Sequence, residues 1–218
     1  MQRTQLALGL VLASLNLSYS SIVTYSFNSS AGSEVTFSPD SQPLGATVGD
    51  MARGTGLTAS PASGAFSASG WTTSTTRDLN DYFTFSISPQ ANYEMTLTSL
   101  VLDERRSGTG IREWSVYSSL DGYSTALGTF PVPDDTLDRL DQTIIFGTAF
   151  ASLSGPVSFR IYGYSSEGST GTWRIDNVEV FGSIAAVVPE PSTWVAGALL
   201  ALPFGVHGVR CLRNRKRA

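Results

Sequence analysis

Short runs of alternating apolar and polar residues occupy the middle of the chain. Such alternation places one side of an extended strand in a core and the other side in water. The gaps between runs hold Gly, Pro, Asn and Asp, which are typical of turns, and no amphipathic helix longer than two turns is evident. The alternating apolar positions are Val23/Tyr25/Phe27, Phe83/Phe85/Ile87, Tyr93/Met95/Leu97, Trp114/Val116 and Val157/Phe159/Ile161. The pattern predicts an all-β fold, a single antiparallel β-sandwich or jelly roll over residues 21–183.

Two segments depart from simple alternation. Near the end of the predicted domain, Trp173 and Ile175 occupy odd-numbered positions, whereas Val178 and Val180 occupy even-numbered ones. In a regular strand, odd and even positions point to opposite faces. One strand buries both pairs only if it absorbs an extra residue, so we predict a β-bulge at Asp176-Asn177. Residues 35–75 are rich in Pro, Gly, Ala and Ser, which predicts long loops framing one or two strands.

The N-terminal segment has the pattern of an export signal. Arg3 precedes an apolar stretch from Leu6 to Leu17, and small residues at Ser18 and Ser20 suit a signal peptidase. We therefore expect residues 1–20 to be a signal peptide handled by the Sec machinery and removed after Ser20. The apolar stretch is too short for a first transmembrane helix.

The C-terminal segment combines three features in order. Residues 184–192 are a predicted linker that contains a Pro-Glu-Pro motif. Residues 193–212 are a predicted transmembrane helix, an apolar segment whose length is close to the ~20 residues that span a bilayer. Residues 213–218 are a predicted basic cytoplasmic tail. Pro189 and Pro191 favour an extended backbone, and the cations favour the cytoplasmic side; these cations are Arg210, Arg213, Arg215, Lys216 and Arg217. On physical grounds alone, a plain membrane anchor and a processing signal fit equally well.

This segment resembles the PEP-CTERM sorting region of exported bacterial proteins. The resemblance rests on the hexapeptide, the apolar segment and the terminal basic cluster, over about residues 187–218; the hexapeptide is Val188, Pro189, Glu190, Pro191, Ser192 and Thr193. It implies recognition by an exosortase, a membrane-embedded processing enzyme, with cleavage at or near Pro189-Glu190-Pro191. It also implies an inner-membrane-anchored precursor that is delivered to the cell surface, the outer envelope or the extracellular space, where extracellular polysaccharide is made.

Composition narrows the function classes. Residues 21–187 carry seventeen Asp or Glu and eight Arg, a net charge of −9, which argues against nucleic acid as a partner. The single cysteine, Cys211, and the single histidine, His207, lie outside this range. The predicted domain therefore has no disulfide, no Ser-His-Asp triad and no histidine-based zinc site.

Carboxylates are the remaining candidates for catalysis or metal binding. One group consists of Asp103, Glu104 and Glu113, which flank Arg105, Arg106 and Arg112. Two such acids facing each other across a cleft are what a glycoside hydrolase needs. The favoured interpretation is a solvated hairpin with Arg–carboxylate pairs. Ca²⁺ suits oxygen-rich clusters, so we name as candidate ligands either Asp134, Asp135, Asp138 and Asp141, or Asp176. A structural role is the favoured interpretation for both sets.

Aromatic residues are candidates for sugar binding, because sugar C–H faces stack on exposed rings. We name Trp71, Tyr117, Tyr123, Tyr162 and Tyr164, with Trp173 as a further possibility. Tyr162 and Tyr164 share a strand face with Arg160; that face either forms a platform or packs under a loop. Residues 117–123, with their Ser-x-Asp-Gly turn, and 171–180 resemble the hairpin and final strand of galactose-binding-like jelly rolls.

Taken together, these features predict an exported, non-enzymatic surface or extracellular-matrix protein that binds polysaccharide. The alternatives are a carbohydrate-active hydrolase with paired carboxylates and an unprocessed membrane-anchored periplasmic protein. Distinguishing them requires knowing which acidic and aromatic side chains meet on one surface.

Overall fold

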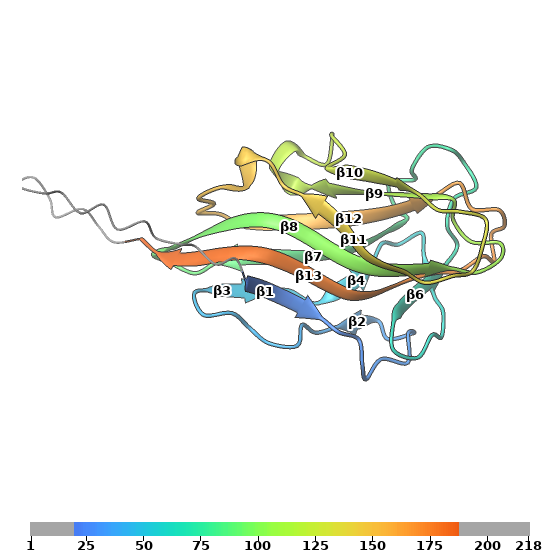
Figure 1. The fold of residues 1–218 in the computed structure, drawn as a ribbon, viewed down its shortest axis with the longest axis horizontal. Coiled ribbons are helices and arrows are strands. Elements are labelled where there is room, and N and C mark those ends of the chain that lie inside the picture. Colours follow the sequence, from blue (N-terminus) through green and yellow to red (C-terminus); the bar gives the residue numbers. More distant parts are fainter. Residues whose placement is uncertain (1–19, 188–218) are drawn as a thin grey trace, which may run out of the picture. The chain divides into compact units, whose positions relative to one another are not determined.

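The protein folds as two antiparallel β-sheets packed face to face, as seen in a computed structural model that describes residues 20–187 (Figure 1). The antiparallel sandwich predicted from the sequence is thus confirmed. Two 3₁₀ turns, Ser119–Asp121 and Thr148–Phe150, are the only helical elements among these residues, and none of the helices found there is long and apolar enough to cross a membrane. The expected signal peptide, membrane span and basic tail lie outside the described residues.

Sheet A contains the two longest strands. Its order is β11 (Arg139–Ile145), β8 (Tyr93–Arg106), β13 (Trp173–Ala186), β6 (Phe66–Ser69) and β5 (Thr58–Ala59), and β1 (Ser20–Tyr25) also pairs with β13. β8 and β13 run side by side through the middle of Figure 1. Residues 184–186, assigned to the linker from the sequence, continue β13 instead.

Sheet B packs against the inner face of sheet A. Its order is β10 (Gly128–Pro131), β9 (Glu113–Ser118), β12 (Val157–Tyr164), β7 (Tyr82–Pro89), β4 (Met51–Arg53) and β2 (Thr36–Phe37), and β3 (Ala46–Val48) also pairs with β7. β9 and β10 pair as consecutive strands, which confirms the hairpin expected around residues 117–123. The expectation of one or two strands within residues 35–75 is wrong: five strands of two to four residues lie there.

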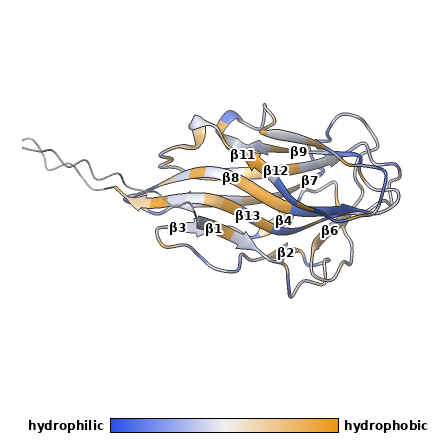
Figure 2. Cartoon of the chain, in the orientation of Figure 1, coloured by the Kyte–Doolittle hydropathy of each residue, from blue (hydrophilic) through white to orange (hydrophobic). Residues whose placement is uncertain are grey.

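The alternating apolar residues meet between the two sheets. Figure 2 colours the strands by hydropathy, and hydrophobic segments recur along β8 and β13. Trp173 lies at the centre, where its ring contacts Trp71 edge-on at 5.3 Å and Phe83 at 5.6 Å. Trp114 completes this group at 5.9 Å from Trp173. Burying such rings supplies much of the hydrophobic stabilisation of a domain that contains no cysteine.

The predicted bulge in β13 is confirmed. Ile175 and Val178 are both fully buried, and between them Asn177 has a φ of 45°, in the left-handed region. A similar irregularity occurs in β11, where the register shifts between Arg139 and Gln142 and Asp141 has a φ of 53°. The two bulges lie in the strands on either side of β8, and they shape the outer face of sheet A.

Candidate functional site

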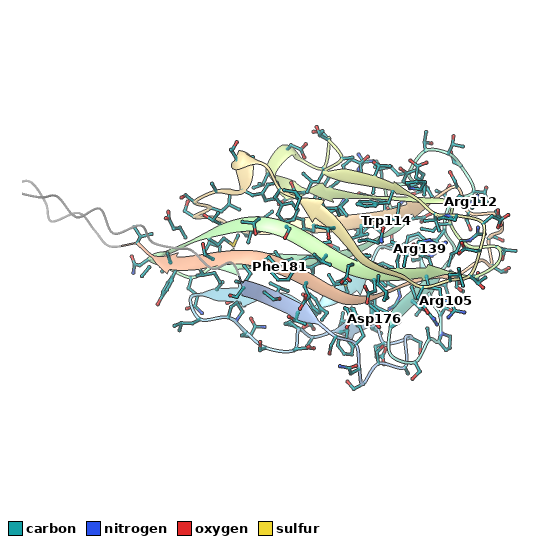
Figure 3. All side chains as sticks on the ribbon, viewed as in Figure 1. Arg105, Arg112, Trp114, Arg139, Asp176 and Phe181 are labelled. Atoms are coloured by element: carbon teal, nitrogen blue, oxygen red, sulfur yellow. The ribbon has the colours of Figure 1, made fainter. Side chains whose placement is uncertain are left out.

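A cleft of about 380 Å³ opens on the outer face of sheet A. β8 and β13 supply its floor, the start of β11 one side, and the connection between β5 and β6 the other. We call it the sheet A cleft, and its residues are Ser63–Ala65, Asp103–Arg105, Asp138, Leu140, Arg174, Asp176 and Asn177. Figure 3 labels Arg105 and Asp176, which lie near the same end of sheet A.

Strand periodicity explains the polar character of this floor. In β8, Glu104 and Arg106 are buried, whereas Asp103 and Arg105 lie on the opposite side of the strand, because successive side chains alternate between faces. β13 repeats the arrangement with Arg174 and Asp176 at partly exposed positions. Two neighbouring strands thus present an Asp-x-Arg and an Arg-x-Asp pattern to the same surface.

The Asp103 carboxylate links the two bulges. One oxygen accepts a hydrogen bond from the backbone N–H of Asp141 at 2.8 Å, and the other accepts one from the Asn177 side-chain amide, also at 2.8 Å. The Asp176 carboxylate accepts the backbone N–H of Asn177 at 2.8 Å. These bonds fix the floor of the cleft, because they satisfy groups that the irregular backbone leaves unpaired.

Opposite charges alternate across the cleft. Asp138 lies 3.5 Å from both Arg105 and Arg174, and all three side chains remain at least one-third exposed. Burial raises the pKa of Asp176; the N–H of Asn177 opposes this effect and the nearby Asp103 charge adds to it. The cleft therefore offers both guanidinium donors and carboxylate acceptors in a partly desolvated setting.

The opposite rim is held by a half-buried arginine. Arg53 donates hydrogen bonds to the carbonyls of Gly32 and Ser67 at 2.6 Å and 2.9 Å, and it stacks on Phe66 at 3.6 Å. Burial lowers the pKa of Arg53 to about 10. Gly32 has a φ of 87°, and a Cβ there would overlap the backbone of Ala62. The connection that forms the rim is consequently fixed at both of its ends.

An ion network supports the cleft from below. Glu104, expected from the sequence to lie in a solvated hairpin, is 3% exposed. It accepts a hydrogen bond from Trp173 Nε1 at 2.7 Å and forms an ion pair with Arg139 at 3.2 Å. Burial raises the pKa of Glu104, although Trp173 and Arg139 act in the opposite direction. Arg106, also buried, forms ion pairs with Asp134 and Glu167.

A second hollow of about 330 Å³ adjoins the first. Both hollows are lined by Arg105 and Arg174, and the second also includes Arg106, Ser107 and Thr172. The two cavities share residues and together form a groove beside the connection from β5 to β6. A groove of this kind has room for more than one unit of a polymer.

The structure buries three of the five aromatic residues proposed for sugar binding. Trp71 is 1% exposed and donates its ring N–H to the carbonyl of Ala68 at 2.9 Å, Tyr162 is 0% exposed, and Tyr164 bonds to Glu113 at 2.8 Å. Trp173 is likewise in the core. These rings cannot serve as exposed platforms, because core or loop residues cover them. Tyr117 and Tyr123 are only half-buried and lie on the outer face of sheet B.

The aspartates named as calcium ligands mostly face arginines. Asp134 contacts Arg106 and Arg112, Asp135 contacts Arg139, and Asp138 contacts Arg105 and Arg174; Asp141 lies in the β11 bulge. No group of three or more metal-binding side chains is found within residues 20–187. Calcium binding at Asp176 or at the cluster stays a prediction. The sorting hexapeptide and the basic residues of the tail lie outside the described range.

Arg174 is a cleft residue that sequence reasoning missed. The sequence does contain a pattern that points to it, because charged residues alternate with buried ones in both β8 and β13. What the sequence did not reveal is that these strands are neighbours, because some seventy residues separate Asp103 from Arg174.

No protein-family model matches the sequence, and no curated protein shows significant similarity. Among solved structures, a family 29 carbohydrate-binding module has a TM-score of 0.38 and 13% identity, over 80% of this chain and 97% of that one.

Two further solved structures give similar values. The K1 cleaved adhesin domain of Lys-gingipain from Porphyromonas gingivalis W83 has a TM-score of 0.37 and 11% identity, over 72% and 95% of the two chains. A family 29 carbohydrate-binding module from Piromyces equi has a TM-score of 0.36 and 11% identity, over 75% of this chain and 89% of that one. All three TM-scores lie below 0.5, so these likenesses carry no argument about the ligand of this chain.

Proposed function

We propose that this chain is an exported, non-catalytic polysaccharide-binding protein and that the sheet A cleft is its binding site. The observation that carries the proposal is the fixed alternation of Arg105, Asp138 and Arg174 along an open surface groove. Sugar hydroxyls both donate and accept hydrogen bonds, so they suit carboxylates and guanidinium groups placed side by side. Leu140, which is exposed, adds an apolar contact for the C–H groups of a sugar ring.

The rigidity of the cleft favours binding. Asp103 is held by two bulges, Asp138 lies between two arginines, and the rim is fixed through Arg53. A site whose groups are already positioned loses less conformational entropy when a ligand binds. A polymer that lies along the groove would contact both hollows through their shared arginines.

A hydrolase is the second candidate, favoured by one observation. Asp176 has a raised pKa and lies in the cleft near Asp103, which is a common arrangement for a catalytic acid. However, both oxygens of Asp103 already accept hydrogen bonds, and Glu104 is buried against Trp173 and Arg139. Asp138, the remaining carboxylate of the cleft, lies 3.5 Å from both Arg105 and Arg174. The other carboxylates of the cleft are thus engaged in hydrogen bonds or ion pairs, and binding without catalysis is the better supported function.

Delivery of the domain is inferred from the resemblance of about residues 187–218 to the PEP-CTERM region. In this proposal, the signal peptidase removes residues 1–20, the apolar segment holds the precursor in the inner membrane, and an exosortase cleaves near Glu190. The acidic domain then reaches the outer envelope or the extracellular polysaccharide. The supporting features are those of the sequence: the Pro-Glu-Pro motif, the apolar segment and the basic cluster.

Affinity electrophoresis of the purified domain in gels containing neutral soluble glucans, mannans or galactans tests the binding site. We expect retardation by at least one polymer and a loss of at least tenfold in affinity for Arg105→Ala and Arg174→Ala. Glu94→Gln, at the end of β8 that lies outside the cleft, is the control and should bind like the wild type. The proposal is wrong if no polymer retards the domain, or if both cleft variants bind normally.

The same polymers distinguish binding from hydrolysis. Incubation with the wild-type domain should release no reducing ends above the buffer background. If reducing ends appear and the Asp176→Asn variant abolishes them, the hydrolase is correct and the non-catalytic proposal is overturned.

A further inference from the structure

Two arginines and four tyrosines meet on the outer face of sheet B, on the opposite side of the sandwich from the cleft. We call this group the arginine–tyrosine cluster. Its members come from β7, β9, β12 and two connections, and they are Arg77, Tyr82, Tyr117, Tyr123, Arg160 and Tyr162. All except Tyr162 are half-buried. The cluster therefore lies at the surface and has a buried ring as its base.

Both guanidinium groups contact that base. Arg77 lies 4.8 Å from the centre of the Tyr162 ring, and Arg160 donates a hydrogen bond to the Tyr162 hydroxyl at 3.3 Å. Arg77 also stacks on Tyr117 at 3.6 Å, while Arg160 stacks on Tyr123 at 4.0 Å and lies 4.4 Å from Tyr82. Two positive charges are thus held beside one ring by contacts with aromatic faces.

These two arginines differ from the other arginines within residues 20–187. Five of the eight arginines there form ion pairs with carboxylates, and Arg53 donates its hydrogen bonds to backbone carbonyls. Arg77 and Arg160 form no ion pair with any described carboxylate, although this part of the chain carries a net charge of −9. Arg77 Nη1 is buried and has no hydrogen-bond partner there. The positive charge of the cluster is therefore not neutralised by the domain itself.

The nearby carboxylates are engaged elsewhere. Asp121, in the connection that carries Tyr123, accepts hydrogen bonds from Ser124 and Thr125. Asp78, which follows Arg77, accepts the backbone N–H of Asn80 at 2.8 Å. Both guanidinium groups contact Tyr162 and have no counter-charge among the described residues, so an anion bound beside them would be attracted by two positive charges.

We propose that the arginine–tyrosine cluster binds the carboxylate of a uronic acid residue in an acidic polysaccharide. The Arg160 guanidinium, whose Nη1 bonds to Tyr162, can match a planar carboxylate with two parallel hydrogen bonds. Arg77 contributes its charge, because its Nη2 donates to the Tyr123 carbonyl at 2.7 Å and its Nη1 is buried. The half-buried tyrosines provide ring surface for the sugar that carries the carboxylate. A single acidic sugar fits this local positive charge better than a dense polyanion does, because the rest of the domain is acidic. The proposal does not depend on the sheet A cleft, and either site can bind without the other.

Titration of the intact folded domain with galacturonate oligosaccharides, followed by NMR of the arginine side-chain N–H groups, tests the proposal directly. We expect saturable shifts at Arg77 and Arg160 and none at Arg139, which is paired with Glu104 and Asp135 and lines neither hollow of sheet A. Inorganic sulfate, inorganic phosphate and neutral galactose oligosaccharides are the comparison ligands. Similar shifts with sulfate or phosphate at equal concentration would show that the site recognises any oxyanion, which would overturn the uronate assignment.

Calorimetry with variants provides the second test. Arg77→Gln and Arg160→Gln should each weaken uronate binding at least tenfold, Arg160→Lys should bind with intermediate affinity, and Glu94→Gln, in β8 and outside both proposed sites, should bind like the wild type. Circular dichroism identifies any variant that does not fold. The proposal is wrong if the wild-type domain shows neither heat of binding nor NMR shifts, or if both glutamine variants fold and bind normally.

Discussion

The Asp103 carboxylate accepts a hydrogen bond from the side-chain amide of Asn177 at 2.8 Å, across the boundary between β8 and β13. Its other oxygen accepts the backbone N–H of Asp141 in β11. One side chain thus connects three adjacent strands at the two places where their pairing is irregular. The floor of the sheet A cleft depends on this connection.

Removing the Asp103 carboxylate should destabilise the domain. Asp103→Ala leaves the Asp141 N–H and the Asn177 amide without their partner, which we expect to lower the free energy of unfolding by about 1–3 kcal/mol. Urea denaturation measures the change. Glu94→Ala, in the same strand and without any hydrogen bond or ion pair among the described residues, is the matched control and should change stability by less than about 0.5 kcal/mol. Equal effects of the two variants would contradict this role.

The left-handed backbone at Asn177 should discriminate between side chains. Asn177→Val places a β-branched residue at a φ of 45° and removes the bond to Asp103, whereas Asn177→Gly removes the bond but fits the backbone. We expect the valine variant to be less stable than the glycine variant by about 1–2 kcal/mol. Thermal unfolding of both proteins provides the comparison, and a valine variant as stable as the glycine variant would argue against the bulge.

Asp176 should titrate above the usual range of an aspartate. Burial raises its pKa, the Asp103 charge adds to this rise and Arg174 opposes it. The pKa of Asp176, read from its carboxyl carbon by NMR, should therefore fall in Asp103→Asn and rise in Arg174→Gln.

The raised pKa of Asp176 also sets the direction of a pH effect on stability. The folded state binds this proton more tightly than the unfolded state, so the contribution is present below the unfolded pKa and is lost as pH rises through the folded pKa. Replacing Asp176 by asparagine should remove this component from the pH profile of stability. An unchanged profile would show that Asp176 has an ordinary pKa.

Buried and exposed carboxylates of the ion network should differ in their effect on stability. Glu104→Ala removes the partner of Trp173 Nε1 and Arg139 in the protein interior, so we expect a loss of about 3–5 kcal/mol. Asp138→Ala removes longer, largely exposed ion pairs and should cost about 1 kcal/mol or less. Chemical denaturation under identical conditions compares them, and a cost below 1 kcal/mol for Glu104→Ala would contradict its structural role.

Processing of the C-terminal segment predicts where the mature protein ends. In the native envelope fraction, the mature protein should end near Pro189-Glu190-Pro191, and replacing these three residues by alanine should leave a longer, membrane-associated precursor. Peptide mass spectrometry identifies the C-terminus in each case. Recovery of residues 194–209 still joined to the domain in the wild type would support the unprocessed membrane-anchored alternative.

Strand positions and the β13 bulge could be predicted because they depend on local parity. Trp173, Ile175, Val178 and Val180 are all buried, and this requires the extra residue at Asn177. The five short strands between residues 36 and 69 could not be predicted, because two to four residues are too few to display alternation. Their positions are fixed by pairing: β2 pairs with β4, β3 and β4 pair with β7, β5 pairs with β6, and β6 pairs with β13.

The binding surfaces were only partly predictable. Tyr117, Tyr123 and Tyr162 were named from the sequence and do meet in space, but Tyr82 and Arg77 also join them, and Tyr162 is covered. Whether an aromatic residue on an outward strand face is exposed depends on which loop crosses it. This is a property of chain segments far apart in the sequence.

The sequence by itself determined the two-sheet architecture, the β13 bulge and the acidic, cysteine-free composition of the domain, because alternation and charge are local properties. It also contains the short linear motifs on which the proposals of export and sorting rest. Only the tertiary structure decided that β8 and β13 are neighbours and that Asp103, Arg105, Arg174 and Asp176 therefore share one cleft. It also decided that Arg77 and Arg160 meet over Tyr162 without a described counter-charge, because long-range strand pairing and loop packing bring these residues together.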